Sequence, residues 1–380
     1  MNLQNKYRKQ GLVGIVRLML ITFSMVVLAS WVNKPFTLVV LGQPKNSGNE
    51  PSRVVVQKQR GGSGRTFADW CREKASLSPE IKYTVEVLLE EAGTANCEVA
   101  DRRLSSLTEL KLDKNQIRDI EPLASLTNLN RLVINKNQIR DIKPLASLTN
   151  LNWLDLSKNQ ISDIKPLEFL TKLDTLELYN NQISDIKPLE SLTNLTWLQL
   201  HNNQINNIKP LESLTDLTYL ILANNQISNI KPLGSLTKLN TLQLENNQIS
   251  DIKPLEFLTN LTWLVLHNNQ ISDIKPLESL TNLTNLSLKN NQISDIKPLQ
   301  SLTNLVGLSL ANNQISDIKP LASLTKLGEL YLDNNKISDI KPLASLINLA
   351  ALKLSGNPIN PKACPLKPYL GSISICDWEP

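Results

Sequence analysis

The sequence has few of the residues that most often carry catalysis or hold metals. It contains two histidines and four cysteines among 380 residues, and aromatic residues make up only 4%. Neither a GxSxG nor an HExxH motif occurs, and the glycine-rich stretch at 61–66 lacks the lysine of a phosphate-binding loop. The sequence therefore predicts no enzyme, no cofactor and no metal site.

The net excess of positive charge lies at one end of the chain. The formal net charge is +5, but residues 1–65 hold ten Lys and Arg residues against a single acid, Glu50, and so carry +9. That leaves −4 for the other residues. A mildly acidic main domain lacks the basic surface that nucleic acids require, so no nucleic acid is expected as a partner.

The N-terminal residues have the layout of an export signal. Three basic residues within the first nine precede an apolar run from Leu18 to Val32, which is typical of a secretory signal, with cleavage expected after Ala29. The alternative is an uncleaved membrane anchor over residues 11–32, which must hold Arg17 within the bilayer. Both interpretations place the remainder outside the cytoplasm, as a secreted, periplasmic or cell-surface protein. Residues 1–32 are thus predicted to be a signal peptide or anchor, and residues 33–65, rich in Gly, Pro and Ser, a flexible linker.

From Leu107 to Leu349 a leucine recurs at every twenty-second residue. The repeated pattern is LxxLxLxxNxIxDIxPLxxLTx, and its first leucine is called position 1 below. A fixed period of this length is typical of a solenoid, because each unit can bury its apolar side only against its neighbours. This predicts twelve stacked units over residues 107–357.

The constant positions of the unit indicate its structure. Alternation around positions 4 and 6 predicts a short strand, and stacked strands predict one parallel sheet. Proline at position 16 fixes φ and needs no donor partner, which favours 3-10 or irregular turns over long helices. Position 9 is always asparagine, whose amide can satisfy backbone groups that the turn leaves unpaired. This predicted ladder comprises Asn115, Asn137, Asn159, Asn181, Asn203, Asn225, Asn247, Asn269, Asn291, Asn313, Asn335 and Asn357.

The pattern resembles the 22-residue class of leucine-rich repeat found in bacterial internalins and in a eukaryotic regulator of protein phosphatase. The resemblance covers Leu104 to Asn357 without a gap. It implies a curved α/β solenoid, with a parallel sheet on its concave face and turns on its convex face. Internalins also begin with a helical cap. Residues 358–380 are too few for an immunoglobulin-like domain of about 100 residues, which disfavours an internalin-like adhesin.

The segments that flank the repeats are predicted to cap the open ends of the core, over residues 66–106 and 358–380. Ser78, Pro79 and Glu80 look like a helix start, apolar residues then recur at helical spacing, and Gly93 supplies the stop. The N-terminal cap is therefore predicted to be helical, and the C-terminal cap short and irregular.

The four cysteines lie outside the repeats. Cys71 and Cys97 precede them, and Cys364 and Cys376 follow them. A disulfide needs its Cα atoms within about 7 Å, and the stacked units hold the two ends of the chain far apart. The predicted bridges are therefore Cys71–Cys97 and Cys364–Cys376, one in each cap.

The variable positions of the unit are expected on the concave face. Positions 3 and 5 flank an inward-pointing leucine, so their side chains point the other way, and position 7 follows them. Aromatic side chains recur there in units three to eight, and we expect them to be exposed, as suits contact with a protein or peptide. The predicted ligand-binding residues are Trp153, Tyr179, Trp197, His201, Tyr219, Ile221, Trp263, Val265 and His267.

The predicted function is protein binding by an exported, non-enzymatic protein. A cell-surface adhesion module that binds carbohydrate is an alternative, because flat aromatic rings also stack on sugars. A cytosolic scaffold like the phosphatase regulator is a third hypothesis, which conflicts with the export signal. The lysines at position 15 are interpreted as a solvated convex face, because Asp and Glu are interspersed with them.

Overall fold

The computed structural model describes residues 64–360, 364, 376 and 377, all within one compact unit that spans Arg60–Pro380. The predicted signal or anchor segment, and all but the last two residues of the predicted linker, lie outside the described residues. Within the described part of the chain, no helix has the length and apolarity needed to cross a membrane.

Among the described residues, four short helices precede the repeats, where the sequence pattern predicted one. The predicted helix is present and begins after Ser78, whose side chain accepts a hydrogen bond of 3.3 Å from the backbone N–H of Ile81. Thr66 and Asn96 cap the α-helices on either side in the same way, within segments too short for a clear apolar period. The helices are α2 (Phe67–Arg72), η2 (Lys74–Ser76), α3 (Pro79–Glu91) and α4 (Cys97–Ser105).

This helical cap closes the first open end of the core. Phe67 and Leu88 are fully buried, and the Thr84 hydroxyl donates a bond of 2.6 Å to the carbonyl of Asp119 in the first repeat. The predicted disulfide between Cys71 and Cys97 is confirmed, with Cα atoms 5.5 Å apart, and it ties α2 to α4.

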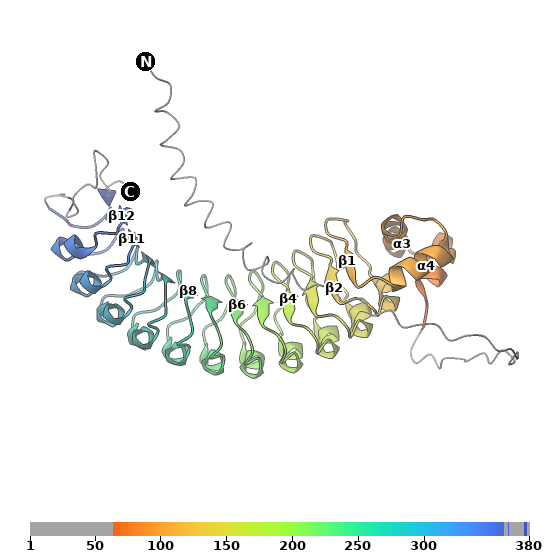
Figure 1. Cartoon of the computed structure of the whole chain (residues 1–380), viewed down its shortest axis with the longest axis horizontal. Coiled ribbons are helices and arrows are strands. Elements are labelled where there is room, and N and C mark those ends of the chain that lie inside the picture. The colour runs from red at the N-terminus through yellow and green to blue at the C-terminus, as the bar shows by residue number, and fades with distance from the viewer. Residues whose placement is uncertain (1–63, 361–363, 365–375, 378–380) are drawn as a thin grey trace, which may run out of the picture. The chain divides into compact units, whose positions relative to one another are not determined.

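The repeats form the predicted parallel sheet, whose strands follow one another in chain order on the concave side of the repeat unit (Figure 1). A thirteenth strand adds to the twelve predicted. It contains Cys376, which forms the confirmed bridge with Cys364, and it pairs with β12. The strands are β1 (Glu109–Lys111), β2 (Arg131–Val133), β3 (Trp153–Asp155), β4 (Thr175–Glu177), β5 (Trp197–Gln199), β6 (Tyr219–Ile221), β7 (Thr241–Gln243), β8 (Trp263–Val265), β9 (Asn285–Ser287), β10 (Gly307–Ser309), β11 (Glu329–Tyr331), β12 (Ala351–Lys353) and β13 (Cys376–Asp377).

The convex side consists of 3-10 helices, as the recurring proline predicts, and each carries Pro in its first turn. The aspartate two residues before the lysine caps the turn: Asp251 accepts a bond of 2.8 Å from the backbone N–H of Lys253. The aspartate therefore has a structural role beyond its charge. The helices are η3 (Glu121–Ser125), η4 (Lys143–Ser147), η5 (Lys165–Phe169), η6 (Lys187–Ser191), η7 (Lys209–Ser213), η8 (Lys231–Ser235), η9 (Lys253–Phe257), η10 (Lys275–Ser279), η11 (Lys297–Ser301), η12 (Lys319–Ser323) and η13 (Lys341–Ser345).

Asparagine rows join each repeat to its neighbour. At position 9, the amide of Asn203 donates to the carbonyl of Leu178 in the preceding repeat at 3.1 Å, and its oxygen accepts from the N–H of Ile183 at 3.0 Å. A second row, at position 22, donates to the preceding repeat in the same direction, as Asn194 does to the carbonyl of Thr171 at 2.8 Å. Much of the constant polar sequence thus pairs backbone groups between units.

Position 8 has a further requirement that the pattern alone does not reveal. The backbone there has positive φ in every repeat, from Lys114 (63°) to Gly356 (69°). Asparagine tolerates this conformation better than other residues with a side chain, and it fills the position from Asn180 to Asn334. The doubled Asn of the repeat therefore serves two purposes, a left-handed turn and a ladder.

The core is a set of aliphatic rows. Leucine or isoleucine at positions 4, 6, 11, 14, 17 and 20 is almost completely buried along the repeats. Each such side chain stabilises the fold by roughly 1.5–3 kcal/mol. Because the rows occupy the constant positions, they leave positions 3, 5 and 7 free to vary.

Candidate functional site

The concave sheet places equivalent positions of neighbouring repeats side by side. Trp197 on β5 is in register with Thr175 on β4 and with Tyr219 on β6. Since the strands are parallel and unshifted, side chains at position 3 form one column across the sheet, and those at position 5 form another. This geometry brings the predicted aromatic residues into contact although they are 22 residues apart in the sequence.

Two stacked pairs lie at the middle of this face. The rings of Trp197 and Tyr219 are 3.5 Å apart between centroids and 7° from parallel. The rings of Tyr179 and His201 are 4.4 Å apart and 9° from parallel. The first pair is called the central platform below.

Cations from the chain itself accompany the aromatic rings nearer the N-terminus. The guanidinium carbon of Arg131 lies 4.1 Å from the ring centre of Trp153, and Lys158 Nζ lies 5.7 Å from that of Tyr179. Both distances are within the range of cation–π attraction. In the described residues, no such cation is found over the central platform or over Trp263.

The burial of the predicted ligand-binding residues differs from the expectation of exposed side chains. Eight of the nine are half-buried, and Ile221 on β6 is only 8% exposed. The reason is lateral packing, because a flat ring at one repeat covers its neighbour in the next. Val265 and His267 are half-buried beside Trp263, at positions 5 and 7 of the eighth repeat. A ligand on this face would therefore contact the edges and faces of partly covered rings. It would not meet fully exposed side chains.

Several polar atoms on this face are buried without a hydrogen-bond partner among the described residues. They include the indole nitrogens of Trp197 and Trp263, Nδ1 of His201 and Oε2 of Glu245. A buried donor or acceptor without a partner costs about 1–3 kcal/mol.

Two carboxyl groups on this face were not among the predicted site residues. Burial, with a contribution from the Asp155 carboxylate, raises the pKa of Glu177 to about 7. Burial also raises the pKa of Glu245. The presence of acidic residues at positions 5 and 7, next to the column of aromatic residues, could have identified them.

Asp155 differs from these two carboxyl groups because its oxygens are occupied. It is only 7% exposed, and Oδ1 accepts from the backbone N–H of Ser157 at 2.9 Å and from its hydroxyl at 2.6 Å. Oδ2 accepts from the side chain of Asn135. Asp155 therefore organises the third repeat and is not available to a ligand.

Neither histidine is placed to hold a metal with the other. Burial lowers the pKa of both His201 and His267, and the nearby Lys158 and Lys289 lower them further. Nδ1 of His267 lies 3.4 Å from the hydroxyl of Ser287. Among the described residues there is no group of three or more His, Cys, Asp or Glu side chains that could bind a metal ion.

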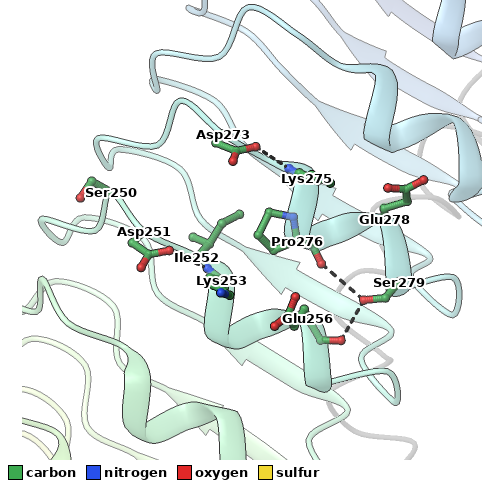
Figure 2. Close-up of a pocket in the computed structure, with 10 residues that line it drawn as sticks. All are labelled: Ser250, Asp251, Ile252, Lys253, Glu256, Asp273, Lys275, Pro276, Glu278 and Ser279. Carbon is green, nitrogen blue, oxygen red and sulfur yellow. Dashed lines mark hydrogen bonds between the residues drawn. The ribbon is translucent and has the colours of Figure 1, made fainter.

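A hollow lies on the convex side, between η9 and η10 (Figure 2). Lys253 and Lys275 line it, and the Ser279 hydroxyl bridges the repeats by donating to the carbonyl of Glu256 at 2.8 Å. A similar hollow recurs between η11 and η12. Because the hollow recurs where equivalent residues of neighbouring repeats pack together, it results from the repeat structure.

The sequence of the chain matches a known family over more than half of its length. Residues 105–147, 149–191, 216–256, 259–301 and 303–345 match the family described as Leucine Rich repeats (2 copies). An internalin (inlF) from Listeria monocytogenes is 38% identical, with a TM-score of 0.69 over 78% of this chain and 94% of that one. The chain belongs to the internalin-like leucine-rich repeat proteins.

Other solved leucine-rich repeat structures are also similar. Internalin C2 (inlC2) of Listeria monocytogenes is 39% identical, with a TM-score of 0.51 over 54% of this chain and 91% of that one. The ectodomain of the Arabidopsis thaliana receptor kinase GASSHO1/SCHENGEN3 is 27% identical, with a TM-score of 0.54 over 68% of this chain and 36% of that one. A comparison with curated protein sequences gives no match. Leucine-rich repeat domains of this kind are typically non-catalytic and generally bind proteins.

Proposed function

We propose that this chain is an exported, non-catalytic protein that binds another protein through the concave face of repeats three to eight. The central platform of Trp197 and Tyr219 carries this proposal. Tyr and Trp dominate the energetics of protein interfaces because they bury a large area with little loss of side-chain freedom.

The two disulfides support export. Bridges such as Cys71–Cys97 and Cys364–Cys376 persist in oxidising surroundings outside the cytoplasm. The relationship to an internalin agrees with the same location. The basic and apolar residues 1–32 supply the export signal or anchor in this proposal.

A similar solved structure supports protein binding by this kind of repeat domain. The structure of the GASSHO1/SCHENGEN3 ectodomain holds a complex with CASPARIAN STRIP INTEGRITY FACTOR 2. In the present chain the concave sheet offers the stacked rings of Trp197 and Tyr219 to such a partner.

The test is capture of partners on immobilised full-length chain. The variant Trp197→Ala/Tyr219→Ala/Trp263→Ala should lose the captured proteins while keeping the circular dichroism spectrum of the parent. The matched control is Phe169→Ser/Phe257→Ser, which removes two exposed aromatic side chains from the convex side and restores the serine found in most other repeats. The control should capture as the parent does.

Two outcomes would contradict the proposal. One is unchanged capture by the concave variant, and the other is equal loss in both variants. Binding of the parent to a polysaccharide array that depends on the same three side chains would instead favour a carbohydrate ligand.

A further inference from the structure

The variable positions of the concave face carry negative charge and no positive charge in repeats four to eight. Positions 3, 5 and 7 of these five repeats contain two acids, Glu177 and Glu245, and no Lys or Arg. Lys158 in the third repeat and Lys289 in the ninth lie on either side of this stretch. The side chains at positions 3, 5 and 7 of repeats five to seven, together with Glu177 and Trp263, are called the acidic window below.

Neither carboxylate of the acidic window forms an ion pair within the described part of the chain. The ion pairs found there involve other groups, such as Arg131 with Glu109 at 3.4 Å. Oε2 of Glu245 is buried without a hydrogen-bond partner. Against the effect of burial, Arg131 lowers the pKa of Glu177 without forming an ion pair with it. Both half-buried carboxyl groups are thus left without a cation in direct contact with their ionised form.

The aromatic rings of the window lack a cation as well. In the third and fourth repeats, Arg131 and Lys158 lie against Trp153 and Tyr179. The central platform and Trp263 have no cation of this kind from the described residues. The window therefore combines two features that attract a positive charge, ring faces and carboxylates, without containing one.

The hydroxyl of Tyr219 marks where the two features meet. Burial raises the pKa of Tyr219, and the carboxylates of Glu177 and Glu245 raise it further. Both acids therefore act on the same ring of the central platform, one from each side. A cation that lies against this ring is within the field of both.

We propose that the acidic window binds an extended segment of a partner protein that carries two basic side chains, Lys or Arg, about four residues apart. This inference rests on the proposed function and specifies its partner. One basic side chain pairs with Glu177 beside the central platform, and the other pairs with Glu245 in the seventh repeat.

The spacing follows from the sheet. Glu177 and Glu245 lie in repeats four and seven, at positions 5 and 7. Three strand spacings, about 14 Å, and two residues along the strand, about 7 Å, therefore place them about 16 Å apart. An extended segment advances about 3.3 Å per residue, so four residues cover about 13 Å and the long side chains of Lys or Arg cover the remainder. Side chains at i and i+4 of an extended segment point to the same side, toward the sheet.

The experiment is selection of a displayed library of random 12-residue peptides on the full-length chain at pH 8. The selected peptides should be enriched in Lys or Arg, with two basic residues about four positions apart. A synthetic selected peptide should bind Glu177→Gln/Glu245→Gln at least tenfold more weakly than the parent. The matched control, Glu190→Gln/Glu278→Gln, makes the same charge change on exposed residues of η6 and η10 and should bind as the parent does.

The results separate this inference from the proposed function. Peptides without basic enrichment, no selectable peptide, or equal binding to the parent and Glu177→Gln/Glu245→Gln would overturn the inference. If Trp197→Ala/Tyr219→Ala/Trp263→Ala loses the captured proteins and the glutamine variant keeps them, the proposed function stands and the basic partner does not. If neither variant loses them, both fail.

Discussion

The side-chain amide of Asn225 donates a hydrogen bond of 3.1 Å to the carbonyl of Leu200 in the preceding repeat. The same amide donates to the carbonyl of Leu222 at 3.0 Å, and its oxygen accepts from the N–H of Ile205 at 3.0 Å. Asn225 is 9% exposed, so water cannot easily replace these bonds. One side chain thus holds the turn of its own repeat and joins it to the one before.

Asn225→Ala should destabilise the protein by about 2–3 kcal/mol, because it leaves buried backbone groups without partners. The measurement is urea unfolding followed by circular dichroism. The control is Asn224→Gly, since Asn224 is exposed and has φ of 54°, which glycine adopts freely. The control should change the free energy of unfolding by less than about 1 kcal/mol, and equal losses would contradict this assignment.

Loss of the Cys71–Cys97 bridge should destabilise the N-terminal cap. The bridge closes a sequence separation of 26 residues, for which chain entropy predicts a contribution of about 3–4 kcal/mol. In a solenoid each unit contacts only its neighbours, so the effect should be local. Cys71→Ala/Cys97→Ala should speed amide hydrogen exchange over residues 67–105 and leave that of repeats six to twelve unchanged. A uniform increase along the chain would argue against a capping role.

The Glu177 carboxyl should titrate near pH 7. Burial raises its pKa in the folded chain to about 7 from an ordinary 4.5, so the folded state holds this proton more tightly than the unfolded state. The contribution to stability is therefore present below pH 4.5 and is lost as the pH rises through 7. Nuclear magnetic resonance of the side-chain carboxyl carbon should show this midpoint, and Glu177→Gln should lose less stability between pH 5 and 8. A midpoint near 4.5 would show that water reaches the group freely.

Alanine at two glycines should have opposite outcomes. At Gly356, φ is +69° and an added Cβ would lie 2.0 Å from Oδ1 of Asn334, so Gly356→Ala should lower the free energy of unfolding by more than about 1 kcal/mol. At Gly307 an added Cβ would lie 2.8 Å from the end of the Asn285 side chain, which can rotate away. Gly307→Ala should be nearly neutral, and thermal melts of the two variants compare them directly.

The sequence predicts the scaffold well because the scaffold is repetitive. Twelve copies of one pattern reveal which positions must be apolar, and the recurring proline predicts the 3-10 helices. The helices α2 and α4 were not predicted because they are short and occur once. A short apolar pattern that is not repeated cannot be told from a chance arrangement. The functions of Asp at position 13 and of the first Asn were not predicted either, since both depend on local backbone geometry that letters do not show.

The predicted ligand-binding residues do lie on one face, but their environments could not be predicted. Trp197 and Tyr219 are separated by 22 residues, and only the exact register of β5 with β6 brings their rings to 3.5 Å. That stacking is why the side chains are half-buried. Glu177 is half-buried on the same face, although a glutamate in a repeat surface is usually a solvated acid.

The sequence by itself determined the solenoid, its caps and the pairing of its disulfides. A period of 22 residues leaves one way to bury the leucines, and the cysteines at the two ends are too far apart to exchange partners. Only the tertiary structure decided which variable side chains contact one another, which carboxyl groups are buried and which polar atoms have no partner. The physical reason is that burial in the core depends on residue type and on the period of the repeat, which the sequence shows. Contacts between side chains at the variable positions depend on distances between neighbouring strands, which the sequence does not show.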